Sequence, residues 1–305
     1  MLIKHKLILN TAILVVSMFA MLILASIASS SFHDDIQVTK QIGDIESSFL
    51  QLRRNEKDFL ARKDLKYFDK FDKAMKGLQQ QVSFLQNDLK NSGLVLNEFS
   101  AMQSILTKYD QHFKSLVAMQ KRIGLHAKDG LYGELRGAVH DAEELIGSDN
   151  YQLRSEMLQL RRNEKDFMLR RDEKYIAKFD DNYSKFVNSL DELQPASIDD
   201  MKNKIAVYRA DFNTLTAKEI QLGLDANSGL LGELRRTIHQ TEESFTSLTE
   251  FVNVEIKTAT ANVYSTLTTI IVLIFILISG LMTMISRAIY QPVQSITERI
   301  HTIAD

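Results

Sequence analysis

The fold of this chain is constrained most strongly by an internal duplication. Residues 50–73 and 158–181 are identical at 17 of 24 positions and lie 108 residues apart. Residues 124–144 and 223–243 are identical at 12 of 21 positions and lie 99 residues apart. Such repeats mark two copies of one supersecondary unit. Because the two separations differ, the first copy has nine additional residues between its motifs, and these fall between Ala74 and Lys108.

The duplicated unit is predicted to be helical. Apolar residues recur at helical spacing, as in Phe71, Met75, Leu78, Val82 and Leu85. With 2 Pro and 12 Gly in 305 residues, the chain has too few turn residues for a sheet protein. Breaks at 91–93, 124–130, 147–150, 194–197 and 223–229 give six helices, of which 31–90 and 151–193 are long. We therefore predict an all-α fold of two stacked four-helix bundles.

Two uncharged apolar segments flank the duplication. Residues 7–28 and 267–285 are each long enough to cross a bilayer as a helix. Lys4 and Lys6 precede the first segment and Arg287 follows the second, so the positive-inside rule places both termini in the cytoplasm and residues 30–264 outside. A cleaved signal peptide is the alternative for the first segment, because Ser26 to Ala28 is similar to a cleavage site.

Composition and motifs argue against several functions. The chain has no Cys, which excludes disulfides, thiolate metal sites and cysteine nucleophiles. Its 37 basic and 39 acidic residues give no overall field that attracts nucleic acid. There is no nucleophile elbow, no phosphate loop and no histidine pair at metal-ligand spacing. We expect no enzyme activity, no catalytic residue, no metal and no cofactor.

The chain resembles a known family of receptors. Two helical repeats, each with an Arg-rich motif, between two membrane spans are similar to the helical bimodular sensor domain of bacterial chemoreceptors, the methyl-accepting chemotaxis proteins, and of some sensor kinases. After the second span, the segment from Arg287 to Val293, with Ile296, Ile300 and Ile303, resembles the start of a HAMP linker at 286–305. The resemblance implies an inner-membrane homodimer that binds small organic acids outside the cytoplasm and signals through a cytoplasmic region that this sequence does not contain.

The expected bundles divide the external segment by distance from the membrane. The proximal bundle is predicted to hold residues 30–62 and 172–264, and the distal bundle residues 63–171. Two rival functions stay open at this point. One is the input domain of a sensor kinase that recognises a periplasmic binding protein, and the other is a helical spacer.

The first duplicated motif carries cations beside the core face. At about 100° of rotation per residue, Arg53 lies at the edge of the face that contains Leu52 and Glu56. Lys57 lies farther round, and Arg54 points outward. The corresponding positions in the second copy place Arg161 at the edge and Arg162 outside.

The second duplicated motif carries a matching stripe. Arg136, His140 and Glu143 stand at i, i+4 and i+7, and Arg235, His239 and Glu242 repeat this spacing. Paired guanidinium groups suit a small carboxylate. Family resemblance supports Arg53 and Arg235, because such receptors bind carboxylates with arginines on their first and last helices.

These patterns predict two candidate ligand sites. The proximal site, for a di- or tricarboxylate, consists of Arg53, Arg54, Lys57, Arg235, His239 and Thr241. The distal site, for a smaller acid or for nothing, consists of Arg136, His140, Arg161 and Arg162. The alternative is a structural polar layer in which these cations neutralise buried carboxylates such as Glu56 and Glu164, together with Lys63 and Arg171 between the modules.

Overall fold

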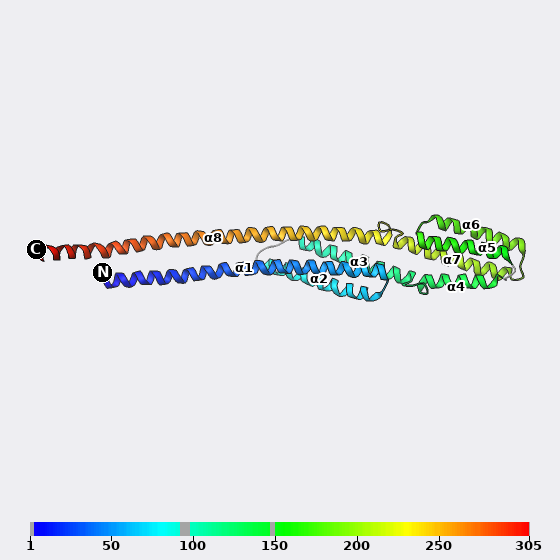
Figure 1. Cartoon of the computed structure of the whole chain (residues 1–305), viewed down its shortest axis with the longest axis horizontal. Helices are drawn as coiled ribbons and strands as arrows, with labels where there is room; N and C mark the ends of the chain where they lie inside the picture. The colour runs from blue at the N-terminus through cyan, green and yellow to red at the C-terminus, as the bar shows by residue number, and fades with distance from the viewer. Residues whose placement is uncertain (1–2, 92–97, 147–149, 305) are drawn as a thin grey trace. The chain divides into compact units, whose positions relative to one another are not determined.

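The structure, a computed structural model, describes residues 3–91, 98–146 and 150–304 (Figure 1). These residues form eight α-helices and no strand, which confirms the all-α prediction. The helices are α1 (Ile3–Arg62), α2 (Leu65–Asn91), α3 (Glu98–Ile123), α4 (Gly130–Leu145), α5 (Tyr151–Arg170), α6 (Lys174–Leu193), α7 (Ile198–Leu222) and α8 (Gly229–Ala304).

Both of the expected long helices are interrupted, so the prediction of six helices is wrong. The chain turns at Lys63 and again at Arg171, which adopt left-handed backbone conformations with φ of 51° and 53°. The following aspartates then fix the entry into the next helices. Asp64 Oδ1 accepts a hydrogen bond from Lys66 N at 2.9 Å, and Asp172 Oδ1, one residue before the N-cap Glu173, accepts one from Lys174 N at 3.0 Å. These capping bonds offset the cost of a left-handed residue that is not glycine.

The two aspartates predict a defined acid sensitivity. Hydrogen bonds to Lys66 and Lys174 lower the pKa of Asp64 and of Asp172. A lowered folded-state pKa contributes stability that is present above about pH 4 and is lost as the pH falls through the folded value. The double variant Asp64→Asn/Asp172→Asn keeps an acceptor for each cap but does not titrate, so its melting temperature should fall less steeply in acid.

Circular dichroism melting of the full chain in detergent micelles tests this expectation. A matched double variant, Asp69→Asn/Asp181→Asn, changes exposed carboxylates that have no ion pair among the described residues. It should retain the slope of the unsubstituted chain. Equal slopes for both double variants would show that the capping carboxylates do not cause the acid sensitivity.

Side-chain contacts join α1, α2, α3 and α8 within residues 45–248, which form one compact unit. Phe113 of α3 lies 5.6 Å from Phe59 of α1 and 4.1 Å from Phe71 of α2, measured between ring centroids. Thr237 of α8 hydrogen bonds to His112 of α3 at 2.8 Å. These aromatic and polar contacts define a first set of four helices.

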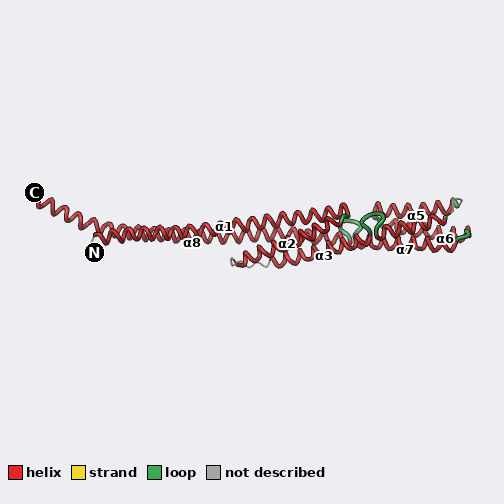
Figure 2. Tube along the Cα trace, turned by 90° about the horizontal axis from the view of Figure 1, so that it is seen from below, coloured by secondary structure: helices red, strands yellow, loops and turns green. Residues whose placement is uncertain are grey.

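The other four helices of this unit form a second set. Phe212 of α7 lies 5.9 Å from Phe167 of α5 and 4.1 Å from Phe179 of α6. Helix α4 packs along α7, α7 contacts α6, and α6 packs along α5, and Figure 1 shows these four helices side by side. The loops that connect the two sets gather between them (Figure 2).

The last helix of each copy of the duplication packs with the first three helices of the other copy. Helices α1–α4 belong to the first copy and α5–α8 to the second, yet α4 packs with α5–α7 and α8 with α1–α3. This grouping differs from the expected boundaries, which separated α2 and α3 from α1. The turn at Lys63 is the physical reason, because it folds α2 back along the direction from which α1 came.

The remaining predicted turns fall at helix ends. The segments 124–129, 194–197 and 223–228 separate helices as expected. Gly223, at a φ of 116°, must be glycine, since a Cβ there would meet the carbonyl oxygen of Ser228 at 2.2 Å. Of the two other predicted breaks, Ser92 and Gly93 lie outside the described residues, as does the segment 147–149.

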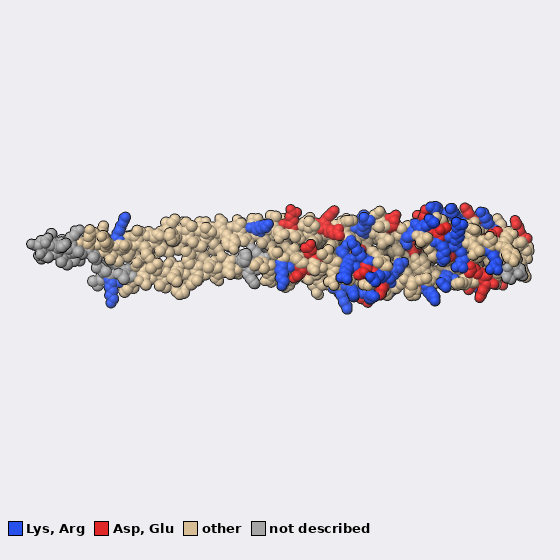
Figure 3. Space-filling view, in the orientation of Figure 1, with Lys and Arg blue, Asp and Glu red and all other residues tan. Residues whose placement is uncertain are grey.

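Two helices in the described part of the chain are long and apolar enough to cross a membrane. Residues Ile8–Ser30 of α1 have a mean hydropathy of 2.5, and α8 reaches the same value between Gly229 and Pro292. The space-filling view shows an extended surface without charged side chains (Figure 3). Helix α8 continues through Pro292, whereas the side chains of Val293, Ile296, Ile300 and Ile303 lie outside the described part.

Candidate ligand sites

A small pocket between α4 and α5 brings together three of the four residues predicted for the distal site. The α4–α5 pocket has a volume of about 140 Å³. Arg136 and His140 of α4 and Arg161 of α5 line it, whereas Arg162 does not. Arg162 is 73% exposed and lies 3.9 Å from Asp166. The other lining residues are Ala127, Tyr132, Leu135, Val139, Glu164, Lys165 and Met168.

Local helix geometry explains why these side chains meet. Leu135 and Val139 are buried on one face of α4, so Arg136 and His140 flank that face one turn apart. On α5, Leu160 and Glu164 are buried, and Arg161 therefore stands at the edge of the buried face. The pocket lies where these two edges face each other.

The cations of the α4–α5 pocket have unequal partners. Arg161 Nη1 donates to Glu143 Oε1 at 2.6 Å. This hydrogen bond raises the pKa of Arg161 against the opposing effect of burial. Arg136 is exposed and has no ion pair among the described residues. An anion entering the pocket therefore finds one guanidinium group already engaged and one free.

The buried carboxylate of the pocket is held from two sides. Glu164 accepts a hydrogen bond from the Tyr208 hydroxyl at 2.7 Å and one from Lys165 Nζ at 2.5 Å. Burial raises the pKa of Tyr208, so its hydroxyl remains a donor. His140 is half exposed, and its Nδ1 lies 3.7 Å from Glu143.

Arg53 of the predicted proximal site is occupied by carboxylates of the protein. Arg53 Nη1 donates to Glu56 Oε2 at 2.5 Å, and its Nε lies 3.6 Å from Glu242. Burial acts to lower the pKa of Arg53. The neighbouring Glu56 carboxylate outweighs this effect, so the pKa of Arg53 is raised. Tyr109 also donates to Glu56. These contacts match the polar-layer alternative at this position.

The predicted proximal residues of α1 and those of α8 do not converge on a common pocket. Arg54, Lys57, Arg235 and His239 are exposed. Thr241 is fully buried, and its hydroxyl donates to the carbonyl oxygen of Thr237 at 2.7 Å, within the same helix. The second copy has this hydroxyl where the first copy has Ala142, and the hydroxyl is already hydrogen-bonded within its own helix.

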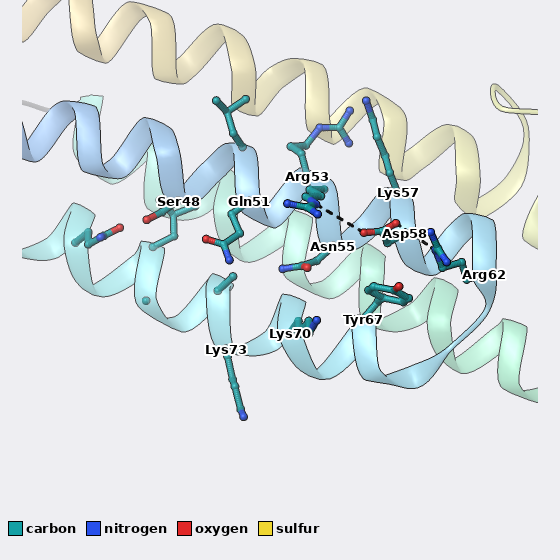
Figure 4. Close-up of a pocket in the computed structure, with 16 residues that line it drawn as sticks. Ser48, Gln51, Arg53, Asn55, Lys57, Asp58, Arg62, Tyr67, Lys70 and Lys73 are labelled. Atoms are coloured by element: carbon teal, nitrogen blue, oxygen red, sulfur yellow. Dashed lines mark ion pairs between the residues drawn. The ribbon is translucent and has the colours of Figure 1, made fainter.

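A larger open groove lies instead between α1 and α2. The α1–α2 groove has a volume of about 990 Å³ and is lined by Arg53, Arg54 and Lys57 but not by α8 residues. Figure 4 shows Arg53 and Lys57 directed toward α8 and Lys73 directed away from α1. The further basic lining residues are Arg62, Lys70 and Lys73. Lys66, Lys70 and Arg62 surround the ring of Tyr67 within 6 Å.

Sequence reasoning missed the part of this groove that α2 supplies. It treated residues 31–90 as a single helix, on which Lys70 and Lys73 lie several turns beyond Arg53 rather than beside it. Asp64, a residue type that favours helix N-caps, is the signal that could have located the start of a new helix. The two copies differ here, because the backbones of α5 and α6 pack closely, whereas those of α1 and α2 make few close approaches.

No metal site is found among the described residues, which contain no group of three His, Asp or Glu side chains placed to hold an ion. Comparison of the chain with known protein families, with curated proteins and with solved structures finds no match. The features that bear on function are therefore the α4–α5 pocket, the α1–α2 groove and the apolar helices.

Proposed function

We propose that this chain is a transmembrane receptor of the chemotaxis type that senses small organic acids. The helices α1 and α8 span the inner membrane of a bacterium, both termini lie in the cytoplasm, and the helices between the spans form a periplasmic homodimer. The first helix set is the proximal module, because α1 and α8 carry the spans, and the second set is the distal module. Helix α8 passes the signal to a HAMP-like segment.

The α4–α5 pocket carries this proposal. It places Arg136, which has no ion pair among the described residues, beside a second guanidinium group, a lysine and a half-exposed histidine. Arg–carboxylate pairs are strong, directional contacts. The volume of about 140 Å³ is similar to that of a cavity of about 150 Å³ that accommodates benzene. A monocarboxylate or a short dicarboxylate therefore fits the pocket.

A larger acid is assigned to the proximal module. The α1–α2 groove is several times larger than the α4–α5 pocket and carries more basic side chains. A di- or tricarboxylate there would compete with Asp58, whose oxygens lie 4.0 Å from Arg54 Nε and 3.5 Å from Arg62 Nε. Exposed pairs of this kind are weak, so a ligand can displace them.

The charge of the same groove favours a second candidate function. Lys57 and Lys73 have no ion pair among the described residues, and Asp58 is the only acidic residue that lines the groove. Basic side chains gather on the face drawn in Figure 3. An acidic surface of a periplasmic binding protein would complement them. The chain would then be the input domain of a sensor kinase.

Calorimetric titration of the full chain in detergent micelles separates these functions. The panel contains acetate, propionate, succinate, L-malate and citrate. Saturable binding of at least one acid is expected, because Arg136 can form a new charge-assisted bond. Silence toward every acid would reject the proposal. Silence combined with binding of a purified acidic periplasmic protein would establish the sensor-kinase alternative.

A further inference from the structure

A buried polar layer adjoins the α4–α5 pocket inside the compact unit. Glu219 of α7 is 4% exposed and accepts a hydrogen bond from the hydroxyl of Tyr132 of α4. Arg171, at the end of α5, lies 2.7 Å from the same carboxylate. Lys63 lies over the ring of Tyr132, 5.7 Å from its centroid. Four helices therefore meet at one tyrosine and one carboxylate.

Tyr132 belongs both to the pocket and to this layer. Its side chain lines the α4–α5 pocket together with Met168. The same two side chains line a second cavity of about 10 Å³, whose other walls include Arg171 and Glu219. That cavity is only large enough for about one water molecule. A group that fills the pocket therefore presses on a ring whose hydroxyl is fixed to Glu219.

Arg171 extends the layer to the loop that precedes α8. Its Nη2 donates to the carbonyl oxygen of Gly223 at 2.9 Å, and its Nε donates to that of Leu224 at 3.0 Å. Gly223 ends α7, and α8 begins six residues later at Gly229. One planar guanidinium group thus holds both the carboxylate and the loop.

The equivalent layer of the first copy lacks this connection. At an offset of 99, Glu219 corresponds to Gln120 and Tyr132 corresponds to Leu231. Gln120 donates directly to the carbonyl oxygen of Gly124 at 2.8 Å, so the loop before α4 is fixed by its own helix. Of these two loops, the one that leads into α8 is tied by charged groups to a pocket-lining side chain.

We propose that Tyr132 is a positioning residue that couples occupancy of the α4–α5 pocket to the start of α8 through Glu219 and Arg171. This inference rests on the proposed function, since it describes how the same site would regulate the signalling helix. An anionic group held by Arg136 and Arg161 packs against the tyrosine ring and keeps its hydroxyl on Glu219. Glu219 in turn holds Arg171 on the carbonyl groups of Gly223 and Leu224, and the loop becomes more ordered.

The absence of Cys from the chain allows a test that needs no ligand affinity. Met168→Cys introduces a single thiol at the wall that the two cavities share. Iodoacetate alkylates this thiol, with loss of iodide, and leaves a carboxylate in the pocket. Iodoacetamide leaves an uncharged amide of the same size. Hydrogen–deuterium exchange of residues 223–234 is then measured for both adducts of the full chain in detergent micelles.

The carboxylate adduct should slow exchange of this segment about threefold or more relative to the amide adduct. Introducing Tyr132→Phe, which keeps the ring and removes the hydroxyl, should abolish the difference. Arg171→Lys should abolish the difference as well, because lysine lacks the guanidinium fork. The substitution should be tolerated by the backbone, since Lys63 adopts the same left-handed conformation at the equivalent position of the first copy. The exposed site Ala118→Cys on α3 is the control, where both adducts should behave alike.

Each outcome bears on the coupling. Equal exchange for the two adducts at position 168 would overturn it, as would a difference that persists in both Tyr132→Phe and Arg171→Lys. If Tyr132 had only a structural role, Tyr132→Phe would change the exchange rate equally in the carboxylate and the amide adduct, and the difference between the adducts would remain. If the carboxylate adduct acts as expected while calorimetry detects no acid, the proposed ligand is rejected and the coupling stands.

Discussion

Replacing Phe113 with Ala should lower the free energy of unfolding by about 3–5 kcal/mol, as expected for a fully buried aromatic side chain. Phe113 has 0% exposure and lies within 6.2 Å of the ring centroids of Phe59, Phe68 and Phe71. Its removal leaves a cavity where three helix segments meet. The remaining rings lose dispersion contacts that no backbone shift can restore.

Denaturant titration of the full chain in detergent micelles, followed by circular dichroism, measures this effect. Phe84→Ala is the matched control, because Phe84 is 57% exposed on α2. It should change stability by less than about 0.5 kcal/mol. A small effect of Phe113→Ala would mean that the first helix set is loosely packed, and the grouping of α1, α2, α3 and α8 would then be in doubt.

Helical class and apolar spans could be read from the sequence because both depend on local composition. The 3.6-residue periodicity and the scarcity of Pro and Gly exclude sheets. The turns at Lys63 and Arg171 could not be read in this way. Lysine and arginine are not residues that break helices. In addition, the spacing of apolar residues continues across the turn, because Phe59 of α1 and Phe71 of α2 both pack against Phe113. The signal was the capping aspartate after each of them.

Helical phase also placed part of the candidate site. It brought Arg136, His140 and Arg161 to one pocket because their positions follow from rotation about two helices. It could not predict the partner of each cation. Arg53 and Arg161 occupy equivalent positions and lie near the equivalent glutamates Glu242 and Glu143. Arg53 makes its shorter contact, however, with Glu56 on its own helix. That choice depends on side-chain rotamers and on neighbouring helices, which spacing does not contain.

Thr241 shows the same limit. Thr241 was predicted to line the proximal site, and it lies fully buried on α8. The inference that its hydroxyl serves a ligand stays a prediction, and the bond to Thr237 argues against it. Threonine in a helix commonly bonds the carbonyl four residues earlier. A buried hydroxyl is therefore a weak indication of a site unless its own helix cannot satisfy it.

The double substitution Arg136→Ala/Arg161→Ala should weaken acid binding more than about a hundredfold. Each hydrogen bond between a charged guanidinium group and a carboxylate contributes about 1.5–3 kcal/mol, and the two together correspond to at least two decades in affinity. The measurement is calorimetric titration with the tightest-binding acid of the panel. Arg136→Ala alone should have little effect on stability, because Arg136 has no ion pair among the described residues.

Arg162→Ala separates ligand contact from general charge. Arg162 lies on α5 next to Arg161 but outside the pocket, where it faces Asp166 at 3.9 Å. Its removal subtracts the same charge as Arg161→Ala and should change affinity by less than about threefold. If Arg161→Ala lowers the melting temperature and leaves acid affinity unchanged, Arg161 serves only to neutralise Glu143. The arginines of the first duplicated motif would then belong to a structural polar layer in both copies, because Arg53 already pairs with Glu56 and Glu242 in the first helix set.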